Sequence, residues 1–364
     1  MHLLLILLLF LLMPAAVLAQ PVQTPVPVPA AEVSADWLPA LTGKRLGLVV
    51  NATSRVGNQQ HLVDFLRQQP LTVARIFAPE HGFRGEADAG AQLVDGVDTA
   101  TGLPVVSLYG AHKKPSPSQL ADLDVLVFDI QDVGVRYYTY ISTLHYLLEA
   151  AAEAGKPVFV LDRPNPNGAL VDGPVLDMAF SSFVGKHPIP LLHGLTVAEL
   201  ARMIQGEGWI QDADKLRLTV VPIRHYRHDM PYSLPVRPSP NLPNDQSIRL
   251  YPSLGLFEGT PVSVGRGTEW PFQVLGWPLD GAGTFAFTPR SRPGATAPPY
   301  QDQRCQGLDL RSEAPAGLSL KYLLHFYRAR PAAQAFFNPF FDKLAGTDQL
   351  RTQIEAGWDE TQIR

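Results

Sequence analysis

The chain has 364 residues, of which 46% are hydrophobic and 18% are charged, a balance that allows folded domains with substantial cores. Its net charge of -4 argues against nucleic acid as a partner, because there is no excess of cations to neutralise a run of phosphates. The length suits two domains of ordinary size.

The N-terminus has the pattern of an export signal. Residues 3–12 consist of Leu, Ile and Phe, and Val17-Leu18-Ala19 is a small-residue cleavage pattern. The apolar run is too short to cross a bilayer comfortably. We therefore expect a cleaved signal peptide at 1–19, no stable membrane span after cleavage and a periplasmic or secreted protein, with an uncleaved anchor as the alternative. The Pro-, Val- and Ala-rich residues 20–35 predict a flexible lead-in.

Residues 36–195 alternate apolar strands with helices. Helical spacing is found at 61–68 and 141–154. Continuous apolar strands separated by helices are typical of a parallel sheet covered on both faces. We therefore predict a Rossmann-like α/β domain for this region. Its five expected strands are residues 45–50, 72–77, 104–108, 125–128 and 157–161.

Residues 196–364 predict a smaller α+β domain, with a cleft between the two domains. Its first helix has Thr196 as a cap and Glu199 at capping-box spacing. The further expected elements are a strand at 216–223, a proline-rich loop at 231–252, short strands with glycine turns at 257–276, and helices at 318–330 and 348–357.

No motif for a cofactor or a metal is present. The loop after the first strand, residues 51–57, lacks the Gly-x-Gly-x-x-Gly pattern of dinucleotide-binding folds. Cys305 is the only cysteine, and there is no His-Glu-x-x-His pattern, so we expect neither an intrachain disulfide nor zinc. The predicted protein thus works without a cofactor.

Polar side chains stand where the expected strands end. In open parallel sheets, ligands bind beyond the carboxyl ends of the strands, so these side chains are predicted to converge on one site. The strand-end residues are Asn51, Glu80, Tyr109, Asp129, Asp162 and Arg163.

Glu80 is the strongest catalytic candidate among them. Pro79 restricts the backbone before it, and Gly82 permits a tight turn after His81. A carboxylate held in such a loop can act as a general acid or base. An ordinary surface turn is the alternative interpretation.

The loops after the fourth and fifth strands are also unusual. Residues 128–140 combine two acids, an amide, Arg136 and three tyrosines that include Tyr137, groups that suit a polyhydroxylated ligand. The alternative is an Asp129–Arg136 ion pair that braces the loop. Asp162, Arg163 and Asn165 follow the fifth strand and either hold ligand oxygens or form a rigid corner.

Several residues of the second half complete the predicted cleft. Stiff or glycine-rich loops carry amides, acids and an arginine in this region, and together they are expected to form the wall opposite the strand ends. The residues of this wall are His193, Asn241, Glu258, Arg266 and Glu269.

An ordered set of motifs over roughly residues 40–360 resembles the NamZ-type exo-β-N-acetylmuramidases. The motifs are Asn51-Ala52-Thr53-Ser54, residues 78–85, residues 128–140, residues 161–166, residues 239–243, Phe257-Glu258-Gly259-Thr260 and residues 264–269.

This resemblance implies a Rossmann-like domain, a smaller C-terminal domain and an active site between them. It also implies release of N-acetylmuramic acid from the non-reducing end of peptidoglycan fragments, so the expected partner is a muramyl sugar or muropeptide. Members usually continue beyond the position of Gly357-Trp358, whereas this chain stops at Arg364. We therefore expect a shortened last helix, and a homodimer stays open as an alternative.

A glycoside hydrolase needs two carboxylates beside the scissile bond. Glu80 is predicted to be the general acid/base, and Glu258, Glu269 and Asp129 are the contenders for the second role. Arg163 or Arg266 could pair with the lactyl carboxylate of a muramyl sugar. The rival hypotheses are an amidase or esterase, for which no Gly-x-Ser-x-Gly motif is present, and a non-catalytic periplasmic sugar- or muropeptide-binding protein.

Overall fold

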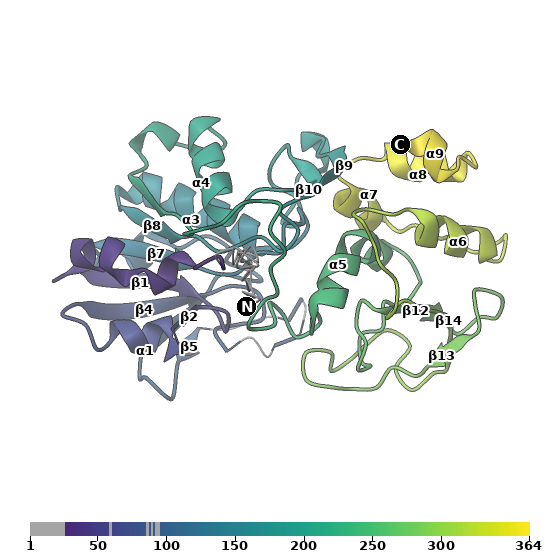
Figure 1. The fold of residues 1–364 in the computed structure, drawn as a ribbon, viewed down its shortest axis with the longest axis horizontal. Coiled ribbons are helices and arrows are strands. Elements are labelled where there is room, and N and C mark those ends of the chain that lie inside the picture. Colours follow the sequence, from purple (N-terminus) through teal and green to yellow (C-terminus); the bar gives the residue numbers. More distant parts are fainter. Residues whose placement is uncertain (1–25, 58–59, 85–86, 89, 92–94) are drawn as a thin grey trace, which may run out of the picture.

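The computed structural model describes residues 26–57, 60–84, 87–88, 90–91 and 95–364, so the expected signal peptide at 1–19 lies outside the described residues. Figure 1 shows an α/β part built from the first half of the chain beside a smaller part built from the second half. In the part of the chain that is described, no helix has the length and apolar character needed to cross a membrane.

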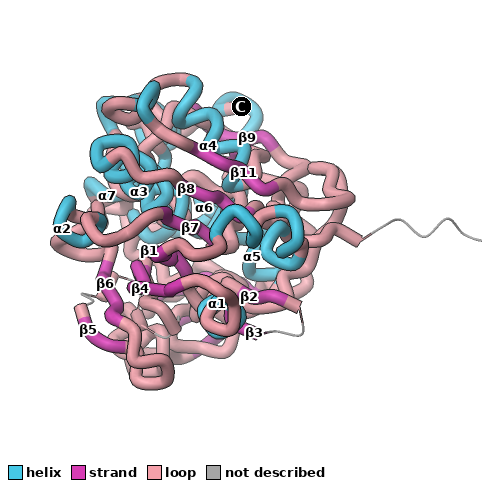
Figure 2. The backbone as a smooth tube through the Cα atoms, turned by 90° about the vertical axis from the view of Figure 1, so that its left-hand side faces the viewer, coloured by secondary structure: helices cyan, strands magenta, loops and turns pink. Residues whose placement is uncertain are grey.

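A seven-stranded sheet forms the centre of the first part, with the strand order β11-β8-β7-β1-β4-β6-β5. All neighbouring strands are parallel except the edge pair β5–β6, and Figure 2 shows β11, β8, β7, β1 and β4 following one another from top to bottom. The strands are β1 (Arg45–Val50), β4 (Thr72–Ala78), β5 (Gly96–Val97), β6 (Pro104–Ser107), β7 (Val125–Asp129), β8 (Val158–Leu161) and β11 (Leu218–Val221). The predicted α/β class and all five predicted strands are confirmed.

Alternation along the strands sends side chains into two cores. Leu126 and Phe128 of β7 pack in the core that contains α3 (Tyr140–Ala154) and α4 (Val197–Gly206), whereas Val125 and Val127 pack in the core that contains α1 (Leu62–Leu66). Because both faces are covered, the strands are apolar throughout. A short helix, α2 (Pro117–Leu120), follows β6.

The boundary between the two domains lies later than we predicted. The strand expected at 216–223 was assigned to the second domain, but β11 pairs in parallel with β8 and forms the edge of the central sheet. The helix α4, capped by Thr196 and Glu199 as predicted, is the crossover between them. A βαβ unit therefore continues past residue 195, so the first domain does not end there.

The described part of the expected lead-in is packed onto the first domain. Ala30 and Ala31 are fully buried, and Trp37 donates a hydrogen bond to the carbonyl of Ala30 at 3.0 Å. Val28 pairs with Arg224 next to β11. Small residues fit closely against the sheet here, so residues 26–35 differ from the flexible segment that their composition suggested.

The second part contains a three-stranded antiparallel sheet and several helices. A proline-rich loop was predicted at 231–252, but a helix begins inside it because Asn244 and Ser247 form a capping box. A short hairpin, β9 (Val171–Val175) with β10 (Pro190–His193), lies between the two parts (Figure 1). The remaining elements are β12 (Val274–Trp277), β13 (Phe285–Phe287), β14 (Cys305–Asp309), α5 (Asp245–Leu254), α6 (Lys321–Ala329), α7 (Pro339–Ala345), α8 (Gln349–Glu355) and α9 (Glu360–Ile363).

Candidate functional site

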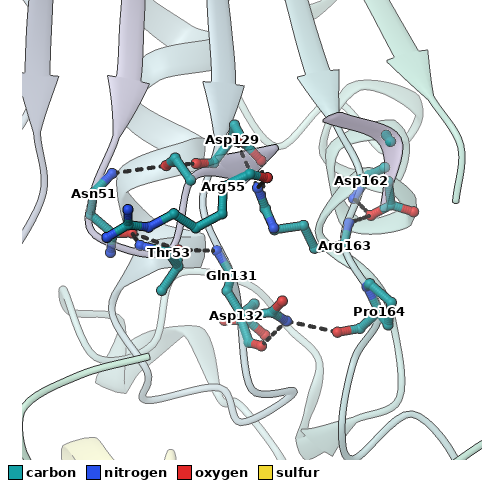
Figure 3. Close-up of polar contacts among 12 residues, drawn as sticks. Asn51, Thr53, Arg55, Asp129, Gln131, Asp132, Asp162, Arg163 and Pro164 are labelled. Atoms are coloured by element: carbon teal, nitrogen blue, oxygen red, sulfur yellow. Dashed lines mark hydrogen bonds and ion pairs between the residues drawn. The ribbon is translucent and has the colours of Figure 1, made fainter. Parts of the chain in front are cut away.

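Asp129, at the end of β7, is fully occupied by an internal ion pair. Nε and Nη2 of Arg163 donate to its two carboxylate oxygens at 2.5 and 2.8 Å, and both side chains are buried. Nη2 of Arg163 also donates to the carbonyl oxygen of Arg55 at 3.1 Å (Figure 3). The structure thus places Asp129 and Arg163 in a buried ion pair of the scaffold, and neither residue lines the cavity between the domains.

Asp162, at the end of β8, caps the helix α4. Its carboxylate accepts hydrogen bonds from Oγ1 of Thr196 at 2.8 Å and from the backbone N–H of Ala198 at 3.1 Å. Burial raises the pKa of Asp162 to about 7, although these hydrogen bonds oppose the shift. Asn165 is likewise structural, because its amide nitrogen donates to the carbonyl of Leu195 at 2.9 Å. Neither residue lines the cavity between the domains.

Asn51, at the end of β1, closes its own loop. Its Oδ1 accepts hydrogen bonds from the backbone N–H and the hydroxyl of Thr53, at 2.9 and 2.6 Å. The Thr53 hydroxyl oxygen in turn accepts from the N–H of Gln131, which links the loops after β1 and β7 (Figure 3). The strand ends at the middle of the sheet therefore form a closed polar network rather than a binding surface.

Arg136 ties the two domains together. Its Nη1 donates to the carbonyls of Pro174 and Ile189 at 2.6 and 2.8 Å, and its Nη2 donates to those of Leu344 and Ala345 at 3.3 and 2.6 Å. The side chain is completely buried, and burial lowers its pKa to about 10. Arg136 does not line the cavity between the domains, and the alternative ion pair with Asp129 is wrong because Asp129 pairs with Arg163.

Two residues of the predicted opposite wall are also structural. Nδ1 of His193 accepts from the N–H of Leu195 at 3.2 Å, and its Nε2 lies 3.6 Å from Oδ2 of Asp132. Nδ2 of Asn241 donates to the carbonyl of Gly294 at 2.9 Å. Both side chains are buried, and neither lines the cavity between the domains.

A cavity of about 700 Å³ lies between the two domains. Loops after β4, β6 and β7 form one side of it, and residues of α5, η6 (Gly255–Gly259) and α7 form the other. The aromatic rings offer apolar faces, and the charged groups are few, as in sugar-binding pockets. Its polar and aromatic lining includes Glu80, His81, Tyr109, Lys113, Tyr137, Tyr138, Thr139, Tyr140, Ser182, Phe183, Ser239, Tyr251, Glu258, Arg266, Phe272, Phe340 and Lys343.

Glu80 lies in this cavity with both carboxylate oxygens held in place. Oε1 accepts a hydrogen bond from the backbone N–H of Gly90 at 3.0 Å, and Oε2 accepts from the hydroxyl of Thr139 at 2.6 Å. The phenol of Tyr109 lies near Glu80, and burial together with the charge of this carboxylate raises the pKa of the phenol. The carboxylate is 9% exposed, so it is nearly desolvated but still reaches the cavity.

The backbone after Glu80 turns sharply, as the sequence predicted. His81 and Gly82 both adopt a positive φ, 68° and 77°, a conformation that glycine accepts readily and histidine does not. Nδ1 of His81 lies 2.6 Å from the carbonyl of Ala87 and so carries the proton of this hydrogen bond. Burial lowers the pKa of His81, which favours the neutral ring. With the proton on Nδ1, Nε2 is unprotonated and can accept a hydrogen bond.

Glu258 and Arg266 form an ion pair on the opposite side of the cavity. Nε and Nη2 of Arg266 both donate to the same oxygen, Oε1 of Glu258, at 3.0 and 2.7 Å. The guanidinium lies 5.0 Å from the centre of the Phe272 ring. The pKa of Arg266 is raised, because the attraction of Glu258 outweighs the burial that lowers it. Oε2 of Glu258 is not used by this pair.

Glu269 is not part of the site. Its side chain is 68% exposed and lies 3.5 Å from Arg292, and it does not line the cavity. Of the three carboxylates considered for the second catalytic role, Glu258 is therefore the one that the structure brings to the same cavity as Glu80.

The sequence did not single out several lining residues. Thr139 and Tyr140 lie inside segment 128–140, which the sequence had already indicated as a binding loop. Tyr137, predicted to bind substrate, does line the cavity, but its hydroxyl donates to the carbonyls of Tyr251 and Pro252 at 2.8 Å each. Phe272 likewise lay in the glycine-rich segment around Arg266. The others come from ordinary loops and helices without a recognisable motif: Lys113, Ser182, Phe183, Tyr251, Phe340 and Lys343.

Within the described ranges, no group of three or more His, Cys, Asp or Glu side chains is arranged to hold a metal ion. Cys305 is buried, and burial raises its pKa to about 11. It is therefore not an activated thiol nucleophile.

Comparisons with known proteins cover nearly the whole chain. Residues 46–246 and 249–364 match the N-terminal and C-terminal family models of exo-β-N-acetylmuramidase NamZ. The peptidoglycan β-N-acetylmuramidase NamZ of Bacillus subtilis is 43% identical in an alignment of 347 positions that covers 88% of this chain and 82% of that protein.

Two solved structures are similar in fold. Both are DUF1343 family proteins from Bacteroides fragilis. One has a TM-score of 0.85 and 44% identity and covers 93% of each chain. The other has a TM-score of 0.78 and 31% identity and covers 90% of this chain and 91% of its own. The junction of the two family models, between 246 and 249, agrees with the position of β11 in the first domain.

Proposed function

This chain belongs to the NamZ family of exo-β-N-acetylmuramidases, and we propose that it releases N-acetylmuramic acid from the non-reducing end of peptidoglycan fragments, with Glu80 as the general acid/base. The observation that carries the catalytic assignment is the position of Glu80: it is held by Gly90 and Thr139 in the interdomain cavity that also contains Glu258. A pair of carboxylates in one saccharide-sized cavity is what glycoside hydrolysis requires.

In this proposal Glu80 protonates the glycosidic oxygen as the bond to the anomeric carbon breaks. The hydroxyl of Thr139 and the N–H of Gly90 fix the carboxyl group. Fixed donors of this kind cost no reorganisation during the reaction. If Glu258 acts as the nucleophile, Glu80 then takes a proton from the water that hydrolyses the glycosyl-enzyme; if Glu258 activates the water, Glu258 takes that proton instead.

Glu258 is proposed as the second carboxylate. Arg266 holds its Oε1, which orients the group while leaving Oε2 outside the ion pair. A negative charge here stabilises the positive, oxocarbenium-like transition state, either as a nucleophile or by activating water. The separation of the two carboxylates around a bound sugar decides between these roles, and participation by the 2-acetamido group is a third route.

Location is part of the proposal. The apolar run and the Val17-Leu18-Ala19 pattern support export to the periplasm or beyond, where peptidoglycan is accessible. N-terminal sequencing of the exported protein is expected to begin at Gln20. The molar mass of the same preparation in solution tests the homodimer that the sequence left open.

The test of the function uses chromogenic N-acetylmuramide and Glu80→Gln. We expect wild-type hydrolysis and a loss of about 10²- to 10⁴-fold in kcat in the variant, the usual contribution of a general acid/base. Glu269→Gln is the matched control, because it removes an exposed carboxylate outside the cavity. Full activity of Glu80→Gln would remove Glu80 from the mechanism. Failure of the wild type on every muramyl and N-acetylglucosaminyl substrate would favour a binding protein instead.

A further inference from the structure

Two lysines line the cavity from opposite domains. Lys113 lies in the loop between β6 and α2, and Lys343 lies in the last turn of α7. Lys113 is half-buried, with its Nζ 4.9 Å from the centre of the Phe183 ring. Among the described residues neither lysine has an ion-pair partner, in contrast to Lys114 next in the chain, which pairs with Glu149 and Glu153. The cavity thus has cationic groups that its own walls leave uncompensated.

The other cations near the site are already committed. Arg266 is neutralised by Glu258, and Arg163 is buried against Asp129 outside the cavity. His81 is neutral because burial lowers its pKa. The two arginines that the sequence suggested for a substrate carboxylate are therefore not available for it.

Lys113 is close to the proposed chemistry through two ring contacts. The Phe183 ring beneath its ammonium lies 5.7 Å, centre to centre, from the ring of Tyr109. The phenol of Tyr109 in turn lies near enough to Glu80 for the carboxylate to raise its pKa. A sugar whose glycosidic bond lies at Glu80 would therefore present its ring substituents along this wall. The ammonium of Lys113 marks where a negative substituent is favoured.

We propose that Lys113, with Lys343 across the cavity, binds the carboxylate of the lactyl ether on O3 of the muramyl ring and so sets the preference for muramyl over N-acetylglucosaminyl substrates. This assignment rests on the proposed function. The lactyl group is the one feature in which the two sugars differ, and it carries the only negative charge. An ammonium offers three donors on a flexible stem, which suits a carboxylate on a rotatable ether.

The test compares three chromogenic substrates: the N-acetylmuramide, its lactyl methyl ester, which has no charge, and the N-acetylglucosaminide. Wild type is expected to favour the free acid. Lys113→Gln should lower kcat/KM on the free acid by about ten- to hundred-fold, the usual loss for one hydrogen bond to a charged group. On the two uncharged substrates it should change kcat/KM by less than about twofold.

Lys343→Gln should have the same selective effect at smaller size, because Lys343 is exposed and exposed ion pairs are weaker. Lys186→Gln is the matched control. Its ammonium also stands over an aromatic ring, 4.9 Å from the centre of Tyr146, but it does not line the cavity. Thermal unfolding of each variant checks the fold.

Three results would overturn the lysine assignment: an equal loss on all three substrates in Lys113→Gln, an equal loss in Lys186→Gln, or a wild type that cleaves the ester as well as the acid. If the wild type cleaves none of the substrates, the glycosidase function itself fails, and the assignment fails with it.

Discussion

At the ends of β7 and β8, the carboxylates of Asp129 and Asp162 accept hydrogen bonds from Arg163 and from the start of α4; we call this the closed side of the sheet. At the ends of β4 and β6, Glu80 and Tyr109 line the cavity; we call this the open side. These two pairs of strands lie on opposite sides of β1 in the same sheet. What separates them is the second domain, whose residues line the cavity opposite the ends of β4 and β6. In this sheet, a polar side chain at a strand end reaches the cavity only where it is not buried in an ion pair or a helix cap of the first domain.

The largest effect is expected from breaking the closed side. Asp129→Asn leaves the guanidinium of Arg163 buried without its counter-charge, so the free energy of unfolding should fall by about 3–5 kcal/mol. Activity per folded molecule should stay near wild type. Denaturant unfolding and kcat at low temperature measure the two effects. A stable but inactive variant would place Asp129 in the chemistry and remove the contrast between the two sides.

At the cavity, Glu258→Gln should lower activity while leaving stability nearly unchanged. Loss of the negative charge near the developing cation should lower kcat by about hundredfold, or about 2.7 kcal/mol. The free energy of unfolding should change little, because the pair with Arg266 is partly exposed. Arg266→Lys, which keeps the positive charge, is the companion variant. Wild-type kcat in Glu258→Gln would mean that this carboxylate only neutralises Arg266.

The wall behind the cavity should behave like the closed side. His145 and His187 are buried, and Nδ1 of His145 forms a 3.1 Å hydrogen bond with Nε2 of His187. His187 lies four residues after Phe183, which lines the cavity. Burial, reinforced by His145, lowers the pKa of His187 to about 3, and burial lowers that of His145 to about 4. The folded state therefore keeps both rings neutral where the unfolded chain, with an ordinary histidine pKa of about 6.5, takes up protons.

The stability contributed by these rings is present above pH 6.5 and is lost as the pH falls toward the lowered pKa values. From His187 alone, the free energy of unfolding should be about 2 kcal/mol lower at pH 5 than at pH 7.5. Urea unfolding at both pH values measures it, and His187→Gln should reduce the difference by that amount. An unchanged pH dependence in the variant would contradict the neutral buried pair.

The smallest of these effects concerns the support of Glu80. Thr139→Val keeps the shape of the side chain and removes the hydroxyl that donates to Oε2 at 2.6 Å. We expect kcat to fall by about tenfold, or about 1.4 kcal/mol, because a hydrogen bond to a charged group is lost. Thr139→Ser should restore most of the rate. A rate unaffected by Thr139→Val would show that the N–H of Gly90 suffices to hold the carboxylate.

Much of the fold followed from sequence because its signals are local. The five predicted strands are continuous apolar runs, and the capping box of Thr196 and Glu199 indicated the start of α4. The strand β11 was placed in the wrong domain because its alternating exposure is that of an edge strand, and nothing local says which sheet it joins. The helix α5 was missed because prolines surround its Asn244 cap.

The site was less predictable, for a physical reason. Glu80 and Asp129 look alike in sequence, since each is an acid near the end of a buried strand. Which one stays free depends on Arg163, 34 residues beyond Asp129, and that pairing exists only in the packed structure. Lys113, Phe183 and Lys343 have no motif at all, because their shared position is created by the approach of two domains.

The hydrogen bonds that Arg136 makes to both domains affect the order in which the domains can fold during synthesis. Two of the four carbonyls that surround its guanidinium, those of Leu344 and Ala345, lie 208 and 209 residues further along the chain. During synthesis, the first domain emerges before two of the four acceptors of this guanidinium have been translated. Its final packing must therefore wait for the last helices, and the gene should not divide into two separately folding products at the domain junction.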